Sequence, residues 1–159
     1  MTTVEQFRAD YLATLPDDHP HHSATFDAWG FGDSPEMMDE LGALVLNGPK
    51  RATASIVIEY EAEGEPIPPV GDISIILDGQ ENPLCIIETT EITIAPLNSV
   101  DTQFAWDEGE GDRTVAWWLD AHRRFFQRTC EANGWAFADD MDTVFERFRV
   151  IYPPENADE

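Results

Sequence analysis

The chain has 159 residues and is strongly acidic, with 32 Asp and Glu against nine Lys and Arg and a formal net charge of -23. Its length fits one domain, and an apolar content of 42% supplies a core, which excludes wholesale disorder. The charge repels polyanions, so an extended footprint on duplex nucleic acid is disfavoured.

Two helices are predicted in the first third of the chain. Apolar residues recur at helical spacing after Thr3, a possible cap, and the pattern ends at Leu15. Ser34, followed by proline, is a typical helix start, and Gly48 is a typical helix end. These patterns predict amphipathic helices that pack against the core.

The segment between these helices is polar and then aromatic. It contains three of the four histidines, in a loop without metalloenzyme spacing, so no metal is expected there. Trp29 and Phe31 follow among glycines. Their rings can stack on a nucleobase or pack in the core, and the sequence leaves both alternatives open.

Lys50 is the only lysine of the chain. It follows a Gly-Pro turn and precedes small hydroxyl residues, which makes it a candidate for chemistry. The alternative is a cation that meets the negative end of a helix dipole.

Three segments rich in Ile, Val and Thr follow, and they are predicted to be strands: residues 51–60, 72–77 and 84–94. Asp78-Gly79 is a strong hairpin signal between the second and third. Consecutive hairpins form an antiparallel meander, and such a sheet often closes into a barrel.

The last third predicts a long helix and a final strand. The helix begins at Asp112 as its cap, buries a largely aromatic face that includes His122, and ends at Gly134. The strand spans residues 143–152, and the tail 153–159 is expected to be disordered.

The two cysteines lack CxxC spacing, so neither a disulfide framework nor a zinc site is expected. No apolar run approaches membrane-spanning length, and the N-terminus lacks the pattern of a signal peptide. We therefore expect a cytoplasmic protein without a membrane partner.

Four motifs in order resemble the ASCH domain family: Gly48-Pro-Lys-Arg-Ala-Thr53, Ile86-Ile-Glu-Thr-Thr-Glu91, Glu108-Gly-Glu-Gly-Asp-Arg113 and Glu146-Arg-Phe-Arg-Val150. The resemblance implies an α+β fold, a PUA-like antiparallel β-barrel flanked by helices, with a cleft for RNA or nucleotides. It divides the chain into an N-terminal helix and loop (1–25), the ASCH domain (26–152) and the tail (153–159).

ASCH proteins differ in function, since some resemble RNA-binding modules, one kind is a ribonuclease and one kind hydrolyses the amide of N4-acetylcytidine. In the last kind a Lys-x-x-Thr pair and a later Glu are catalytic. Lys50 and Thr53 match the pair. Glu108 is the favoured acid, and Glu110 stays open as the alternative.

The proposed chemistry needs these groups in one hollow. Thr53 and Ser55 share a strand face, so Lys50 must lie in the turn before the strand. A lysine among carboxylates stays protonated and can stabilise an oxyanion, which makes Glu108 the better base for a hydroxyl nucleophile.

Further substrate contacts are predicted from Ser55, Glu110, Arg113, Trp29 and Phe31. Arg113 can grip a phosphate or carboxylate, or it can pair with a nearby acid.

The expected partner is a nucleoside or a short single-stranded RNA, and two functions are compatible with it. The first is a hydrolase of a modified nucleoside or of RNA that uses no metal or other cofactor. The alternative is a non-catalytic RNA-binding module.

Overall fold

The computed structural model describes residues 2–158, which form two compact units. Of the described residues, the first unit contains 2–48, 70–90 and 148–158. The second contains Pro49–Pro69 and Glu91–Arg147. Strands β4 and β5 each have residues in both units.

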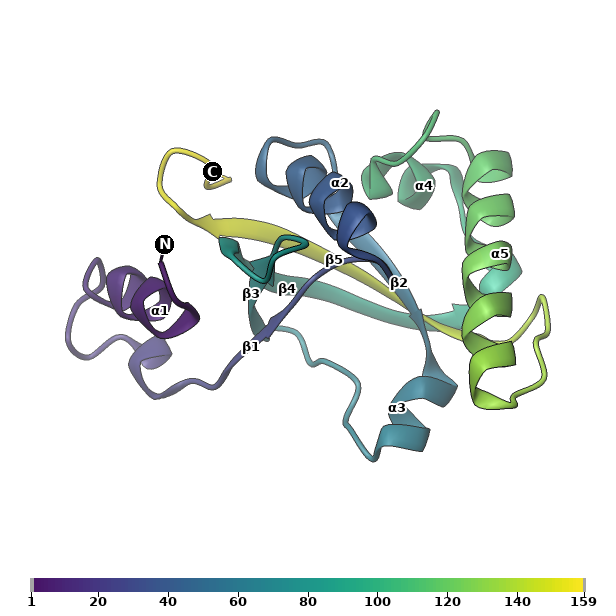
Figure 1. The fold of residues 1–159 in the computed structure, drawn as a ribbon, viewed down its shortest axis with the longest axis horizontal. Helices are drawn as coiled ribbons and strands as arrows, with labels where there is room; N and C mark the ends of the chain where they lie inside the picture. The colour runs from purple at the N-terminus through teal and green to yellow at the C-terminus, as the bar shows by residue number, and fades with distance from the viewer. Residues whose placement is uncertain (1, 159) are drawn as a thin grey trace. The chain divides into compact units, whose positions relative to one another are not determined.

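Figure 1 labels the elements in chain order. The helices are α1 (Val4–Leu12), α2 (Pro35–Leu46), α3 (Val57–Glu63), α4 (Thr102–Glu108) and α5 (Val115–Asn133). The strands are β1 (Phe26–Trp29), β2 (Ala52–Ile56), β3 (Ile73–Leu77), β4 (Pro83–Pro96) and β5 (Asp142–Tyr152). Two short 3-10 turns are η1 (Pro20–Ser23) and η2 (Leu97–Ser99).

The strands form one five-stranded sheet in the order β1-β3-β4-β5-β2. This confirms the α+β class and corrects the predicted antiparallel barrel. The sheet is mixed, because β1 pairs in parallel with β3, and it is open, with β1 and β2 as its edges. The meander prediction fails because β2 pairs with the distant β5 rather than with β3.

Several other boundaries differ from the sequence prediction. The strand expected over residues 51–60 ends at Ile56, and the chain continues directly into α3. Its β-branched and aromatic residues are typical of a strand, which explains the wrong prediction. The hairpin predicted at Asp78-Gly79 is confirmed, since β3 and β4 pair antiparallel around it.

The first unit packs its helices on β3 and the adjoining part of β4. Tyr11 of α1 lies in a core cluster with Ile75 and Ile86, and Val45 of α2 lies in another with Ile87. The caps of both helices are confirmed, since the Thr3 and Ser34 side chains each accept a backbone hydrogen bond.

The C-terminal segment, for which the sequence predicts disorder, is fixed by hydrogen bonds within the first unit over residues 153–158. The backbone N of Asp158 donates to Val150 O, and its carboxylate accepts from Val150 N. The amide of Asn156 donates to the carbonyl of Leu46. The segment is therefore held by two polar side chains, those of Asn156 and Asp158, that each bond to a backbone group.

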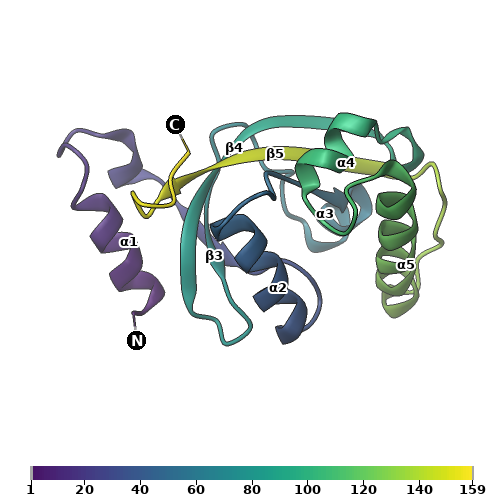
Figure 2. The same ribbon diagram turned by 90° about the horizontal axis from the view of Figure 1, so that it is seen from above.

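The second unit packs α4 and α5 on one core, and the two helices lie side by side in Figure 1 and Figure 2. Helix α5 buries Trp118, Phe126 and Cys130 and ends at Gly134, which has φ 73°. Its cap is Thr114 rather than the predicted Asp112, whose carboxylate instead accepts from the Thr114 hydroxyl. Within residues 2–158, no helix combines the length and apolar character needed to cross a bilayer.

Candidate functional site

Lys50 directly precedes β2, and its side chain is 1% exposed. Its Nζ donates to Ala52 O at 2.8 Å, to Glu108 Oε1 at 2.5 Å and to Glu110 Oε2 at 2.8 Å. An ammonium group has three N–H donors. These acceptors therefore account for the hydrogen-bonding capacity of the buried cation.

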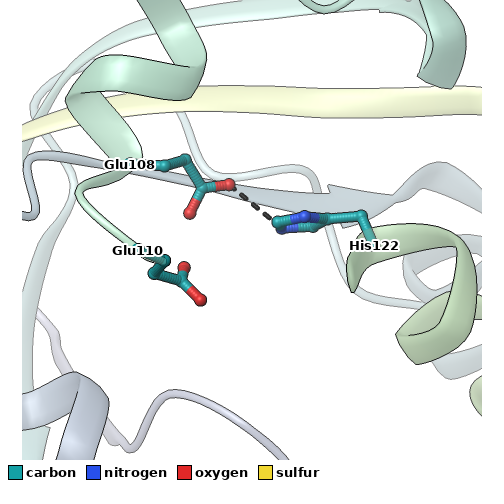
Figure 3. Close-up of side chains that lie close together, drawn as sticks. All are labelled: Glu108, Glu110 and His122. Atoms are coloured by element: carbon teal, nitrogen blue, oxygen red, sulfur yellow. Dashed lines mark ion pairs between the residues drawn. The ribbon is translucent and has the colours of Figure 1, made fainter. Parts of the chain in front are cut away.

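Glu108 ends α4, and both of its carboxylate oxygens are used. Oε1 accepts from Lys50, while Oε2 accepts from Trp118 Nε1 at 2.7 Å and lies 3.1 Å from His122 Nε2. Figure 3 shows the Glu108 carboxylate and the His122 ring pointing toward each other from α4 and α5. A single buried carboxylate thus joins three side chains from two other segments.

His122 faces an acceptor with each ring nitrogen. Nδ1 lies 2.8 Å from the carbonyl oxygen of Trp118, and Nε2 faces Glu108. A carbonyl only accepts, so Nδ1 carries a proton, and the adjacent carboxylate favours a second proton on Nε2. Burial lowers the pKa of His122, but attraction to Glu108 outweighs burial and the pKa is raised. We therefore treat this imidazole as cationic near neutral pH.

The two glutamates differ in their electrostatics. Burial raises the pKa of Glu108, but Lys50 and His122 outweigh it and hold that pKa well below the usual range. Burial and the neighbouring Glu108 charge raise the pKa of Glu110, although Lys50 opposes them. Glu110 is 14% exposed, so it is the more accessible of the two acids, and its pKa is shifted up where that of Glu108 is shifted down.

The pKa of Lys50 is raised as well: burial lowers it, and the two glutamates reverse that effect. The lysine is therefore an ammonium ion in this arrangement. We call the group of Lys50, Glu108, Glu110, Trp118 and His122 the Lys50 cluster.

Glycines explain how the loop after α4 brings Glu110 to Lys50. Gly109 has φ 69°, and a Cβ there would lie 2.8 Å from Lys50 N. Gly111 has φ 58° and packs against the ring of Trp117. Any larger residue at either position would meet both backbone strain and a steric clash.

Thr53 and Ser55 share one face of β2, as predicted. The alternate residues Ala52 and Ile56 are buried in the core of the second unit. Thr53 lies opposite Glu146 in the β2–β5 pair, and the Ser55 hydroxyl is 2.8 Å from the Tyr60 hydroxyl. The structure thus brings together Lys50 and both glutamates, while a role for Thr53 or Ser55 stays a prediction.

The other predicted contact residues lie in two places. Trp29 and Phe31 are in the first unit, where Phe31 is buried in the core and the two ring centres are 4.6 Å apart. This packing matches the core alternative for Phe31. Arg113 lies in the second unit, over the ring of Trp106.

Sequence reasoning missed Trp118 and His122 as partners of the acids. Both were assigned to the buried face of the long helix. Trp118 is buried there, and the His122 side chain is 12% exposed. A buried histidine on an otherwise apolar face was the available signal, because such a group needs a hydrogen-bond partner. The sequence could not say which of the 32 acids supplies it.

A family profile for the ASCH domain matches residues 27–152. The chain belongs to the ASCH domain family. It is similar to the crystal structure of an ASCH domain from Lactobacillus crispatus JV V101, with 35% identity, a TM-score of 0.87 and coverage of 94% of each chain. It is also similar to protein EF3133 from Enterococcus faecalis V583, assigned to DUF984, with 39% identity, a TM-score of 0.81 and coverage of 92% and 86%. Comparison with curated proteins gives no match.

Two of the four ASCH motifs meet at the Lys50 cluster. The motif at residues 48–53 supplies the lysine, and the motif at 108–113 supplies both glutamates. The motifs at 86–91 and 146–150 lie on the neighbouring strands β4 and β5. Two of the motifs that carry the family resemblance therefore contribute side chains to the same group of ion pairs.

Glu108, Glu110 and His122 also form a group with the residue types of metal ligands. One potential ligand atom from each lies within 4.8 Å of the others. The Lys50 ammonium already contacts both carboxylates, so a divalent ion would compete with a built-in cation. The expectation of metal-independent chemistry stays a prediction.

A separate pocket of about 150 Å³ lies elsewhere in the second unit. Its lining includes Phe104, Phe145 and Arg147, and it contains no member of the Lys50 cluster. Arg147 is paired there with Asp107 and Glu91. We therefore place the candidate chemistry at the Lys50 cluster and not in this pocket.

Proposed function

We propose that this ASCH domain binds a nucleobase at the Lys50 cluster and hydrolyses an amide attached to it, as in N4-acetylcytidine, without a metal. Membership of the family suggests RNA binding. The observation that carries the proposal is a buried ammonium held by two carboxylates, of which Glu110 is partly open to solvent. The substrate is a modified nucleoside or a short single-stranded RNA.

The two acids take different roles in this proposal. The sequence favours Glu108 as the base, but its burial, its full set of hydrogen bonds and its lowered pKa suit a positioning role. Glu110 is more accessible and has a raised pKa, so it is the better group to take and return a proton. We assign proton transfer to Glu110 and the orientation of Lys50 to Glu108.

The proposed reaction has two steps. The Thr53 hydroxyl attacks the amide carbonyl, its proton passes to Glu110, and the C–N bond then breaks as Glu110 returns that proton to the leaving amine. Water hydrolyses the resulting ester and regenerates threonine, so the sum is amide plus water to acid plus amine. Protonation of Glu110 loosens its hold on Lys50, which frees one ammonium donor for the oxyanion.

A second candidate is a binding module without turnover. It is favoured by the saturated hydrogen bonding of Lys50, which also suits a static ion pair that shapes a cleft. This alternative predicts RNA affinity without product and without dependence on the Thr53 hydroxyl.

The test is an assay of N4-acetylcytidine and a short single-stranded RNA with the wild type and with Lys50→Met, Thr53→Val and Glu110→Gln. Thr129→Val is the matched control, because that hydroxyl bonds only to the helix carbonyl of Phe125. We expect turnover to fall roughly 10²–10⁴-fold in the three site variants and to stay unchanged in the control.

Circular dichroism must show that each variant is folded. Wild-type turnover in folded Lys50→Met and Thr53→Val would exclude the mechanism. Binding of RNA without any product would leave the binding module.

A further inference from the structure

Arg113 forms no ion pair with an acid in the described part of the chain, although the protein is strongly acidic. Within residues 2–158, carboxylates pair with five cations, Lys50, Arg123, Arg124, Arg147 and Arg149, and with two histidines, His21 and His122. No ion pair is found there for Arg113 or for Arg8, which instead donates to Ala24 O. The chain carries 32 acids, so a pairing partner is rarely far away. An unpaired guanidinium here is a local exception to the negative field.

The guanidinium is nevertheless held in a defined position. Its carbon lies 3.5 Å from the centre of the Trp106 ring, and Nε donates to Trp106 O at 2.9 Å. Trp106 is 52% exposed, so this stacked pair lies at the surface of the second unit. Only Nε is used by these contacts, and the two terminal nitrogens of Arg113 remain for an anion.

The backbone at Arg113 is strained. Its φ is 65°, a left-handed conformation that costs a residue with a side chain of order 1–3 kcal/mol. The adjacent carboxylate of Asp112 is occupied by the backbone N and hydroxyl of Thr114. The strain and the capped acid together leave Arg113 stacked on Trp106 instead of paired with its neighbour.

The same turn connects Arg113 to the Lys50 cluster. The Arg113 N donates to Glu110 O at 3.1 Å, which closes a turn over residues 110–113. The ends of such a turn are less than about 7 Å apart at their Cα atoms. Glu110 and Arg113 are therefore close along the backbone, and in the proposal that follows their side chains contact two parts of one ligand.

We infer that the Arg113–Trp106 pair is a phosphate and base-stacking subsite, and that the substrate is a nucleotide or an RNA segment rather than a free nucleoside. The inference rests on the proposed function of the neighbouring Lys50 cluster. The terminal nitrogens of a guanidinium match two phosphate oxygens, and the exposed Trp106 ring offers a face or edge to the next base. In this proposal the phosphate binds Arg113, whose charge is not paired with a carboxylate.

The test is calorimetric titration of the whole chain with cytidine, cytidine 5′-monophosphate, cytidine 3′-monophosphate and a cytidine trinucleotide. We expect a phosphorylated ligand to bind about 10–100-fold more tightly than cytidine, as for hydrogen bonds to charged groups. Arg113→Gln removes this preference, so that cytidine and its phosphorylated forms bind with similar affinity. Arg124→Gln is the matched control, because that exposed arginine pairs with Asp120 on its own helix and keeps the preference.

A salt titration adds a second readout. With the trinucleotide, the slope of log affinity against log salt becomes about 0.7 shallower in Arg113→Gln, the value for one phosphate contact on a single strand. Equal affinities for cytidine and its monophosphates, or a preference that survives in Arg113→Gln, overturn the phosphate subsite and leave the proposed function standing. If none of the four ligands binds, both proposals are overturned.

Discussion

Glu108 is the side chain that joins the Lys50 cluster. It pairs with Lys50, accepts from Trp118 and faces His122. Lys50, Glu108 and Trp118 are buried, and the His122 side chain is 12% exposed. A buried charge that loses its partner is costly because water cannot replace the lost interaction. The cluster is therefore expected to act as one unit in stability as well as in chemistry.

Glu108→Gln should destabilise the fold by about 3–5 kcal/mol, since it removes the carboxylate charge that faces His122 and leaves Lys50 with Glu110 alone. Asp139→Asn is the control, because it breaks an exposed pair with Arg123 that contributes less than about 1 kcal/mol. Urea unfolding of both variants measures the difference. Similar small losses in the two proteins would show that Glu108 does not hold the cluster together.

The pH dependence of stability follows from His122. Its folded pKa is raised above 6.5, so the folded protein holds this proton more tightly than the unfolded chain. The stabilisation is complete below the unfolded pKa and is lost as pH rises through the folded pKa. The contribution of Glu110 to stability depends on pH in the same direction, because its folded pKa is also raised. Glu108 has a lowered folded pKa, so its contribution is lost as pH falls, and only in the acid range.

We therefore expect the free energy of unfolding to fall as pH rises above about 6.5, the ordinary value for histidine. His122→Gln should flatten this slope, while His22→Gln, a change at a loop histidine, should leave it intact. Urea titrations at several pH values decide the matter. A slope that persists in His122→Gln would point to a different titrating group.

At the scale of elements, the loop between α4 and α5 sets the position of Glu110. Gly111→Ala adds a methyl group where φ is 58° and where the Trp117 ring packs. Gly134→Ala adds the same methyl group at φ 73° in open space, so it measures backbone strain alone. We expect Gly134→Ala to cost about 1–2 kcal/mol and Gly111→Ala to cost more and to lower activity as well. Equal stability losses with unchanged activity would mean that the loop does not position the acid.

Local signals predicted the elements better than their pairing. Ser34 and Gly134 were found because caps depend on a few neighbouring residues. The sequence could not predict that β2 pairs with β5, because the paired positions are about ninety residues apart. The side chains of β2 would be compatible with several other strands as neighbours. The same limit applies to the site: the motifs supplied Lys50 and Glu108, whereas the link to His122 exists only in the folded core.

For the whole molecule, the net charge of -23 opposes compaction. The buried ion pairs of the Lys50 cluster are shielded from salt, but repulsion among the exposed acids is not. Folding is therefore expected to strengthen when salt screens the surface, even though salt weakens any contact with phosphate.

We predict that the melting temperature at neutral pH rises with NaCl and that most of the rise occurs below about 0.15 M, where the screening length falls to roughly 8 Å. The curve should flatten toward about 1 M, where that length is roughly 3 Å. A calorimetric series in NaCl measures the shape. General salting-out would instead give a rise that continues in proportion to concentration, and a flat curve would mean that surface repulsion does not limit stability. The proposed phosphate contact at Arg113 predicts that RNA affinity falls over the same range, so the two titrations distinguish the surface charge that destabilises the fold from the charge proposed to bind phosphate.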